Sequence, residues 1–282
     1  MDGGKQGRAK SEETVRENMQ YIIDFIAGQD ADLMLFQEVD TDSTRSYHVD
    51  EAALIEDAFK EGFSWEFAKN FDSGYFLVPI YEPHGKSKSG ILTLSNACID
   101  SATRYSLPVE DGIRKFFDLD RCYTVNRIPV EGGRTLCLYN LHFSAYTSDG
   151  SIATQQLQIL IDDMQAEYDA GNYVIAGGDF NKDVWGDSGA IMGVSGEDYS
   201  WAKPFPTELL PETFTLVDSL DREHPVASCR NTAEPYVKGE TYEVTLDAFI
   251  VSDNVEVKGC RVLDTGFQCT DHNPIKMEFV LK

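Results

Sequence analysis

The segment that most constrains this chain is Val174–Asp183 (VIAGGDFNKD), where an apolar, strand-like run meets two glycines, an acid and an amide. Residues two apart in an extended segment point to the same side, so Asp179 and Asn181 are expected to face one pocket while Phe180 turns into the core. A glycine before the acid lets a ligand or another backbone approach closely. A carboxylate and an amide at the end of a strand can orient a water molecule or hold a cation.

Three other interpretations of this segment can be compared with the sequence. A strand followed by an ordinary Asx-rich turn needs nothing beyond Asp and Asn, and it stays open. A calcium EF-hand loop that starts at Asp179 requires a glycine and a glutamate where the chain has Val184 and Ala190. A Gly-Asp-x-x-Asp metallophosphatase motif requires an acid where the chain has Lys182. The last two interpretations therefore fail.

The rest of the chain predicts a single domain, 1–282, that opens with a loop over residues 1–11. A capping box at Thr14 and Glu17, followed by apolar residues at helical spacing, predicts a helix that ends at Gly28. Further helices are expected at 50–60 and 151–170, the latter with an inner stripe of Leu157, Leu160, Ile161 and Met164. Strands are expected at 32–39, 64–69, 75–80, 90–95, 97–105, 121–130, 134–142, 173–178, 214–218, 242–251, 255–263 and 275–281, with loops at 82–90 and 184–213. This pattern indicates two packed sheets flanked by helices.

The charge balance limits the class of partner. The 282 residues include 48 acids and 24 bases, which gives a formal net charge of −24 and a pI near 4.4. No region is strongly basic, so long nucleic acid and anionic membranes are disfavoured, although a metal ion and a few local cations still suffice to hold a phosphate. The chain has no apolar run long enough to span a membrane and no signal peptide. Its six scattered cysteines include no Cys-x-x-Cys pair, which argues against a zinc ribbon.

Four further segments repeat the pattern of an apolar strand that ends in, or carries, a polar functional group. Taken singly, most of them also fit a solvated acid, a core histidine or a plain turn. An acid inside an apolar strand is harder to explain in that way, because a buried acid needs a partner. The four segments carry Gln37-Glu38, Asn140-Leu141-His142, Asp247 within Val244–Val251, and Asp271-His272 before Asn273-Pro274.

Taken in order, these motifs resemble the endonuclease/exonuclease/phosphatase superfamily, which has the deoxyribonuclease-I-like fold. The family's motifs run Gln-Glu, Asn-x-His, Gly-Asp-x-Asn, an Asp-bearing strand and a C-terminal Asp-His, and the match extends from about residue 12 to the C-terminus. Lys88–Ser95 also resembles the family's strand that enters the site. The resemblance implies an α+β fold, a four-layer α/β/β/α sandwich of two packed, mostly antiparallel sheets flanked by helices.

The resemblance also implies a metal-dependent phosphoester hydrolase. Carried over to this chain, Glu38 ligates the metal and Asp271 lies at or beside it. Asp179 orients or deprotonates the attacking water, and Asn181 holds that water or the phosphate. Oxygen ligands of this kind favour hard ions, so the expected cofactor is Mg²⁺ or Mn²⁺.

The two histidines of the matching motifs are expected to contact the substrate. His272, paired with Asp247, contacts the scissile phosphate, and His142 contacts the phosphate or the leaving group. An acid behind a histidine fixes its tautomer and favours its protonated form. Candidate substrate contacts are Lys86, Lys88, Arg121 and Asn140.

One departure from the family pattern concerns the N-terminus. The family opens with a strand that ends in Asn, and that amide joins the metal site. This chain shows no strand before its first helix, and Met1–Lys5 resembles what normally follows that Asn. We therefore expect Met1 to be an internal methionine, the sheet to lack a strand, and the site to lack one ligand and to bind its ion weakly.

The expected substrate is a small phosphorylated molecule or a lipid headgroup, because substrate choice in this fold lies in its loops and the acidic surface disfavours long DNA. An aromatic-containing loop offers either a substrate wall or a lid packed on itself, through Trp185, Tyr199, Trp201 and Phe205. Two alternatives stay open: a nuclease of the same superfamily, and a non-catalytic binding module with an incomplete metal site. Nothing in the sequence demands a protein partner, so a monomer is expected, and nothing indicates a compartment.

Overall fold

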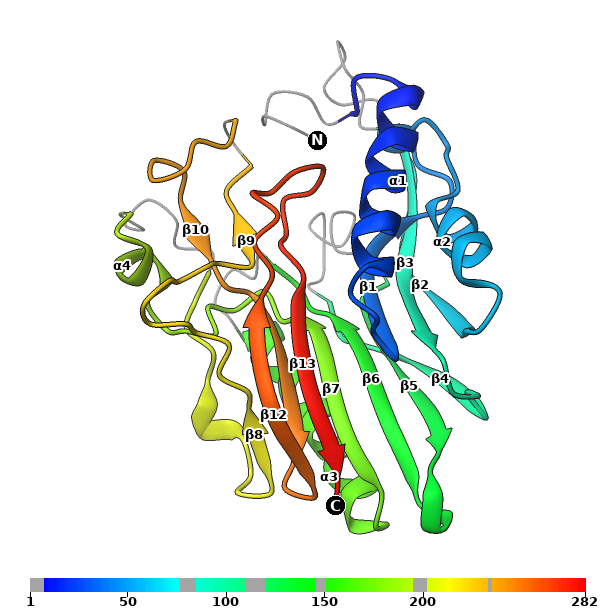
Figure 1. Ribbon diagram of the computed structural model, residues 1–282, viewed down its shortest axis with the longest axis vertical. Coiled ribbons are helices and arrows are strands. Elements are labelled where there is room, and N and C mark those ends of the chain that lie inside the picture. The colour runs from blue at the N-terminus through cyan, green and yellow to red at the C-terminus, as the bar shows by residue number, and fades with distance from the viewer. Residues whose placement is uncertain (1–7, 77–84, 110–119, 146–150, 195–201, 233–234) are drawn as a thin grey trace.

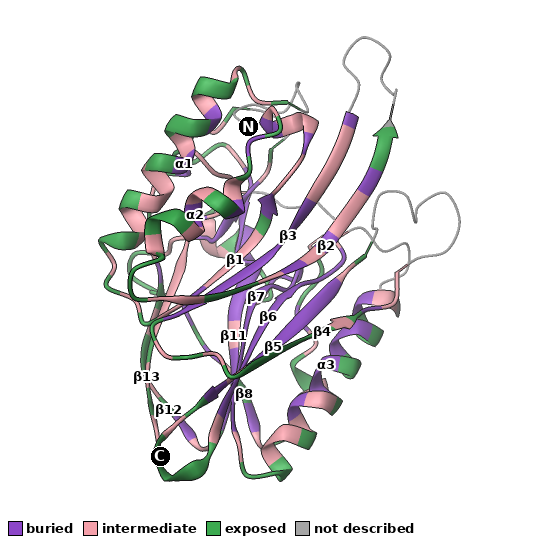
Figure 2. Ribbon diagram, turned by 90° about the vertical axis from the view of Figure 1, so that its right-hand side faces the viewer, coloured by how far each residue is buried: buried purple, intermediate pink, exposed green. Residues whose placement is uncertain are grey.

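Two β-sheets packed face to face form the centre of the protein, and helices cover their outer faces (Figure 1, Figure 2). This α+β sandwich with four layers, α/β/β/α, is the fold class that the sequence predicts. The computed structural model describes residues 8–76, 85–109, 120–145, 151–194, 202–232 and 235–282. Within these ranges, no helix is both long enough and apolar enough to cross a membrane.

The larger sheet has six strands in the order β4-β5-β6-β7-β11-β8. β6 and β7 are parallel and are connected by α3, because a parallel pair requires a crossover. The other neighbours in this sheet pair antiparallel. β6 and β7 are covered on both faces, which explains their nearly continuous apolar sequences. The strands are β4 Ser101–Ser106, β5 Cys122–Pro129, β6 Thr135–His142, β7 Tyr173–Asp179, β8 Phe214–Leu216 and β11 Asp247–Ser252.

The second layer consists of a three-stranded antiparallel sheet, β1-β3-β2, and a separate hairpin, β12-β13. Both pieces bury apolar side chains against the larger sheet, since Leu35 of β1 and Phe279 of β13 share a core with Ile175 of β7. A short pair, β9-β10, lies outside both layers. The bounds are β1 Leu33–Asp40, β2 Ser64–Phe76, β3 Gly85–Ser95, β9 Cys229–Arg230, β10 Glu243–Val244, β12 Val255–Val262 and β13 Ile275–Leu281.

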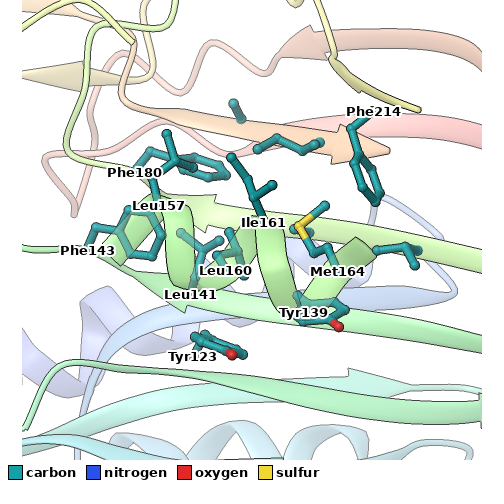
Figure 3. Close-up of a cluster of buried hydrophobic side chains, with 14 of the residues drawn as sticks. Tyr123, Tyr139, Leu141, Phe143, Leu157, Leu160, Ile161, Met164, Phe180 and Phe214 are labelled. Atoms are coloured by element: carbon teal, nitrogen blue, oxygen red, sulfur yellow. The ribbon is translucent and has the colours of Figure 1, made fainter. Parts of the chain in front are cut away.

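Helices pack on the outer faces through apolar residues at helical spacing. In α3, the predicted inner stripe of Leu157, Leu160, Ile161 and Met164 is buried against the larger sheet (Figure 3). α1 and α2 cover the three-stranded sheet in the same way. The helices are α1 Glu12–Ala27, α2 Glu51–Phe59, α3 Ser151–Asp169 and α4 Ser188–Met192, with single 3₁₀ turns at Thr44–Ser46, Glu131–Gly133 and Thr207–Leu209.

The first helix begins earlier than its predicted capping box. Ser11, not Thr14, is the N-cap, because the Ser11 Oγ accepts a hydrogen bond from the Thr14 backbone N–H at 3.1 Å. The helix ends at Gly28, as predicted. The absence of a preceding family strand and of its Asn stays a prediction.

Two predicted strands are parts of one long strand. β2 runs through the gap between 64–69 and 75–80, because register shifts in its pairing with β3 absorb the residues that break the alternation. Residues 77–80 lie outside the described ranges. β3 begins at Gly85, inside the predicted loop 82–90, because its first residues complete the long hairpin with β2.

Gly178 allows β7 to approach β6 closely. Its φ is +142°, and a Cβ there would lie 2.1 Å from the Leu141 carbonyl oxygen. We expect Gly178→Ala to destabilise the fold by about 2–4 kcal/mol, since the clash is with backbone and the conformation suits only glycine. Urea unfolding measures this change in the free energy of unfolding.

Gly259→Ala is the matched control, because a Cβ at Gly259 meets no atom within 4 Å and its φ is not positive. We expect that variant to stay within about 0.5 kcal/mol of the parent. Equal stability of the two variants would contradict the close-approach explanation.

Candidate active site

Three chemistry-bearing residues stand side by side at one end of the larger sheet. His142 ends β6 and Asp179 ends β7, and the parallel register pairs them. Asp247 begins the antiparallel β11 and pairs with Asp179 from the other side. Segments that are more than 30 residues apart in the chain are therefore brought into one row by strand pairing alone.

Asp179 and Asn181 meet through an Asx turn and not through strand alternation, because β7 ends at Asp179 and Asn181 has a φ of +50°. The Asn181 backbone N–H donates to Asp179 Oδ1 at 2.7 Å, and its side-chain Nδ2 donates to Asp179 Oδ2 at 3.1 Å. Nδ2 also donates to the Phe143 carbonyl oxygen at 2.8 Å. Phe180 points the other way, into the core, and packs edge-on against Phe143 and Phe205. The polar pair is thus fixed by its own hydrogen bonds and by the packing of the residue between them.

Burial raises the pKa of Asp179, and the nearby Asp247 carboxylate raises it further. Asp179 is only 6% exposed, so its negative charge has little water to stabilise it. A carboxylate in this state accepts a proton more readily than an ordinary aspartate does. The environment therefore suits a residue that takes a proton from water.

His272 and Asp247 form a hydrogen-bonded pair, as the sequence predicts. His272 Nδ1 lies 2.8 Å from Asp247 Oδ2, and the Ser228 hydroxyl donates to the same oxygen at 2.6 Å. The Ser228 Oγ in turn accepts the backbone N–H groups of Leu246 and Asp247 at 3.0 and 3.1 Å. Ser228 lies in an irregular segment, so no periodicity in the sequence points to it.

His272 carries a raised pKa. Burial alone would lower it, but the Cys229 side chain and the Asp247 carboxylate raise the His272 pKa well above its ordinary value. Burial also raises the pKa of the Cys229 thiol to about 11, so this thiol is neutral near pH 7. The Asp247 carboxylate is therefore the charge that favours the His272 imidazolium.

Glu38 reaches the site from the other sheet through a β-bulge. The register of β1 against β3 shifts between Phe36 and Val39, and Glu38 has a φ of +55°. Its Oε1 lies 3.8 Å from His142 Nε2, and its side chain is 57% exposed. A non-glycine residue in the left-handed region at a bulge marks a side chain that is re-aimed toward a function.

Arg45, a residue that the sequence did not single out, holds Glu38 in place. Its Nη1 donates to Glu38 Oε2 at 2.9 Å, while its Nε and Nη2 bind the buried Asp40 carboxylate at 3.0 Å. Desolvation opposes ionisation of Glu38, but Arg45 and Arg121 outweigh it and lower the Glu38 pKa below its usual range. Glu38 is therefore ionised at neutral pH and is free to accept a cation on its exposed side.

His142 has a character opposite to that of His272. Burial and the positive charge of Arg121 lower the His142 pKa well below its ordinary value. Its Nε2 lies 3.5 Å from Asp179 Oδ2, so it faces the centre of the site. The same charge of Arg121 lowers the pKa of Glu38 and counteracts the rise of the Asp179 pKa. Substrate contact by Arg121 stays a prediction.

The other predicted substrate contacts are Asn140, Lys86 and Lys88. Asn140 is fully buried and links the two sheets: its Oδ1 accepts Gln37 Nε2 at 2.7 Å, and its Nδ2 donates to the Leu92 carbonyl at 3.0 Å. Lys86 forms an ion pair with Asp42. Among the described residues, the hydrogen bonds of Lys88 involve its backbone N–H and carbonyl groups. The Asn140 amide is therefore used to join the two sheets and Lys86 to form an ion pair, whereas substrate contact by Lys88 stays a prediction.

The donor set fits a magnesium-type ion better than an all-protein metal cage. Within the described ranges, no three His, Cys, Asp or Glu side chains converge closely enough to form a complete metal centre. Mg²⁺ keeps several waters and uses one or two carboxylates together with substrate phosphate. Glu38 supplies such a carboxylate, and Asp271, whose backbone oxygen accepts the Arg230 N–H at 3.1 Å, directly precedes His272.

The acids behind Glu38 predict a pH-dependent stability. Burial, with Asp40 adding, raises the pKa of Glu51 to about 7 from 4.5, so the folded state binds a proton that the unfolded state releases between these pH values. This stabilisation is complete below pH 4.5 and is lost as the pH rises to about 7. Glu51→Gln keeps an acceptor for the Asp40 N–H, a 3.0 Å bond, and we expect it to be about 1–3 kcal/mol more stable than the parent at pH 8 and nearly equal at pH 4.

Denaturant unfolding at both pH values checks this expectation. Glu61→Gln, an exposed site just after the same helix, is the control and should show no such pH-dependent difference. A Glu51→Gln variant that is less stable than the parent at pH 8 would show that Glu51 acts there as a favourable anion.

Comparison with known proteins shows which family the chain resembles. Residues 7–272 match the Endonuclease/Exonuclease/phosphatase family. Similar solved structures include an endonuclease/exonuclease/phosphatase from Beutenbergia cavernae (16% identity, TM-score 0.66, 93% of this chain and 66% of that one). They also include ANGEL2, a 2',3'-cyclic phosphatase, in complex with adenosine-2',3'-vanadate (17% identity, TM-score 0.65, 99% of this chain and 90% of that one). A third is the Bacteroides thetaiotaomicron mannosyl-6-phosphatase Bt3783 (16% identity, TM-score 0.60, 99% of this chain and 97% of that one).

No curated protein matches the chain. The solved structures are below 20% identity and therefore establish the shared fold, while the family assignment comes from the match over nearly the whole sequence. Members of this family are hydrolases that act on phosphoesters. With its motifs, its sandwich fold and this match in agreement, the chain belongs to the Endonuclease/Exonuclease/phosphatase family.

Proposed function

We propose that this chain is a divalent-metal-dependent phosphoester hydrolase that acts on a small phosphorylated molecule or a lipid headgroup. The observation that carries the proposal is the row of His142, Asp179 and Asp247, with His272 held by Asp247 and Asn181 held by Asp179. Hydrolysis of a phosphoester needs a positioned water, a proton acceptor and positive charge at the phosphoryl oxygens. Asp179 and Asn181 are suited to hold the water, Asp179 to accept its proton, and His272 to supply the positive charge.

The residues divide the work by their environments. Asp179 accepts the proton of the attacking water, because burial makes it a stronger base than a solvated aspartate, and Asn181 keeps its carboxylate in position. The water oxygen forms a bond to phosphorus as the ester P–O bond breaks. His272, as the imidazolium, and Arg121 offer positive charge to the phosphoryl oxygens.

A bound Mg²⁺ or Mn²⁺ would be held by Glu38, with Asp271 beside it, and would neutralise further charge on the phosphate. Arg45 keeps Glu38 ionised and oriented for this purpose.

The charge of the chain supports a small substrate. A formal charge of −24 repels a long polyanion, whereas a single phosphate can still be held by local cations and a metal ion. Two of the similar structures are described as phosphatases, one for 2',3'-cyclic phosphate and one for mannosyl-6-phosphate, and both names denote small phosphorylated groups.

The direct test is hydrolysis of mono- and bis-p-nitrophenyl phosphate with Mg²⁺ or Mn²⁺ titrated to high millimolar concentration. We expect turnover that a chelator abolishes, and we expect Asp179→Asn to lower kcat by about 10²- to 10⁴-fold, because the proton acceptor is lost. Asp57→Asn, on the exposed side of α2, is the matched control and should retain full activity. Turnover that ignores both the metal and Asp179 would exclude the proposal, and phosphate binding without any turnover would favour the non-catalytic binding module.

A nuclease of the same family is distinguished by a plasmid assay. We expect supercoiled plasmid to stay intact under the conditions that give the fastest nitrophenyl phosphate hydrolysis, because the acidic surface repels DNA. Nicking that requires the metal and is lost in Asp179→Asn would replace the small-molecule substrate with DNA.

A further inference from the structure

A buried amide lies directly behind His142. Asn70 is 2% exposed and belongs to β2, at the register shift between Lys69 and Phe71. Its side-chain Nδ2 lies 3.4 Å from His142 Nδ1. Asn70 points toward the larger sheet, on the same side as Ala68 two residues earlier, which packs beside Cys122 of β5.

This contact has a direction. An amide NH₂ group donates hydrogen bonds and accepts none, so His142 Nδ1 must present its lone pair to Asn70. The single proton of a neutral imidazole then sits on Nε2. His142 Nε2 lies 3.5 Å from Asp179 Oδ2 and 3.8 Å from Glu38 Oε1, so the N–H faces the place where the substrate phosphate is expected.

We propose that Asn70 is a positioning residue that fixes His142 as the neutral, Nε2-protonated tautomer. His142 then binds a phosphoryl oxygen as a hydrogen-bond donor and does not protonate the leaving group. This inference rests on the proposed function for the identity of the ligand, although the tautomer itself does not depend on activity.

The groups around His142 agree with a neutral ring. An imidazolium would place an N–H against the NH₂ of Asn70, which is a contact between two donors. Arg121, Arg45 and His272 add positive charge nearby, while Glu38 and Asp179 add negative charge on the Nε2 side. The carboxylates of Glu38 and Asp179 therefore favour a proton on His142 Nε2, and the NH₂ group of Asn70 disfavours a second proton on His142 Nδ1.

The contrast with His272 shows what the amide changes. His272 Nδ1 faces the Asp247 carboxylate, an acceptor that requires a proton on Nδ1 and favours a second proton on the ring. His142 Nδ1 faces a donor in the corresponding position behind its ring. Two histidines in one site are thereby given different protonation states by the residue that each has at its back.

The tautomer can be measured without any substrate. Long-range ¹H–¹⁵N correlation spectra of the ¹⁵N-labelled protein distinguish protonated from unprotonated ring nitrogens, and His142→Gln assigns the signals. We expect Nδ1 of His142 to be unprotonated in the parent and protonated in Asn70→Asp, which replaces the donor by an acceptor of the same shape. The signals of His272 serve as the internal control and should not change.

A parent protein with a proton on His142 Nδ1 would overturn the proposal. So would an Asn70→Asp variant that is folded, with unchanged His272 signals, and keeps the parent pattern at His142. The parent spectrum alone decides the first point, so the proposal stays testable even if the variant does not fold.

Activity supplies a second, independent readout. We expect Asn70→Ala to lower kcat about tenfold, with little change in KM and by the same factor for p-nitrophenyl phosphate and phenyl phosphate, because the loss of one orienting hydrogen bond costs about 1.4 kcal/mol. A loss that is much larger for phenyl phosphate, whose leaving group needs a proton more, would identify His142 as the general acid and overturn the proposal. A parent without turnover of either ester would contradict the proposed function, while the spectra would still decide the role of Asn70.

Discussion

The close approach of β6 and β7 at Gly178 is the constraint on which the site depends. Because Gly178 has no side chain, the Leu141 carbonyl oxygen can lie only 2.1 Å from the point that a Cβ would occupy. The parallel register of β6 and β7 therefore continues without a break to the ends of both strands. Asp179 is therefore held against His142 on one side and against Asp247 on the other. The chemistry of the site is an outcome of strand pairing, and the long connections between these strands add little to it.

The same row of residues shows how one protein produces different acid–base behaviour from similar side chains. Asp179 is buried beside the Asp247 carboxylate and becomes a stronger base, whereas Glu38 lies against Arg45 and stays ionised. His272 has a carboxylate behind it, and His142 has an amide. Each difference is set by a second residue that does not face the substrate position, which makes the supporting residues as informative as the acids and histidines themselves.

Much of the site could be predicted from the sequence because its principal residues stand at the ends of apolar strands. Glu38, His142, Asp179 and Asp247 follow or interrupt such runs, and strand pairing brings the ends of neighbouring strands together. The prediction of two packed sheets flanked by helices followed from the same runs and from the helical segments between them, and the family resemblance implied the four-layer α/β/β/α arrangement. No single motif is specific for the family, and the resemblance rests on the order in which the motifs follow one another.

The supporting residues could not be found in this way, for a physical reason. Arg45 comes from a single 3₁₀ turn and Ser228 from an irregular segment, and neither has a periodicity that reveals where its side chain points. Asn70 falls just after the predicted strand 64–69, so the sequence assigned it to no face of a strand. Asn140 shows the converse limit, because a motif match marked it for the substrate while its hydrogen bonds to Gln37 and Leu92 bind the two sheets together. Sequence spacing gives the direction of a side chain only where the backbone is regular.

Phe180 has a consequence for how this protein would lose function. The residue between Asp179 and Asn181 is part of the aromatic packing with Phe143 and Phe205, so the polar pair cannot shift unless the hydrophobic core shifts as well. Damage to the core beneath α3, far from any reacting atom, would reach the site through this one ring. The rigidity of the core and the precision of the site are therefore linked through the packing of Phe180.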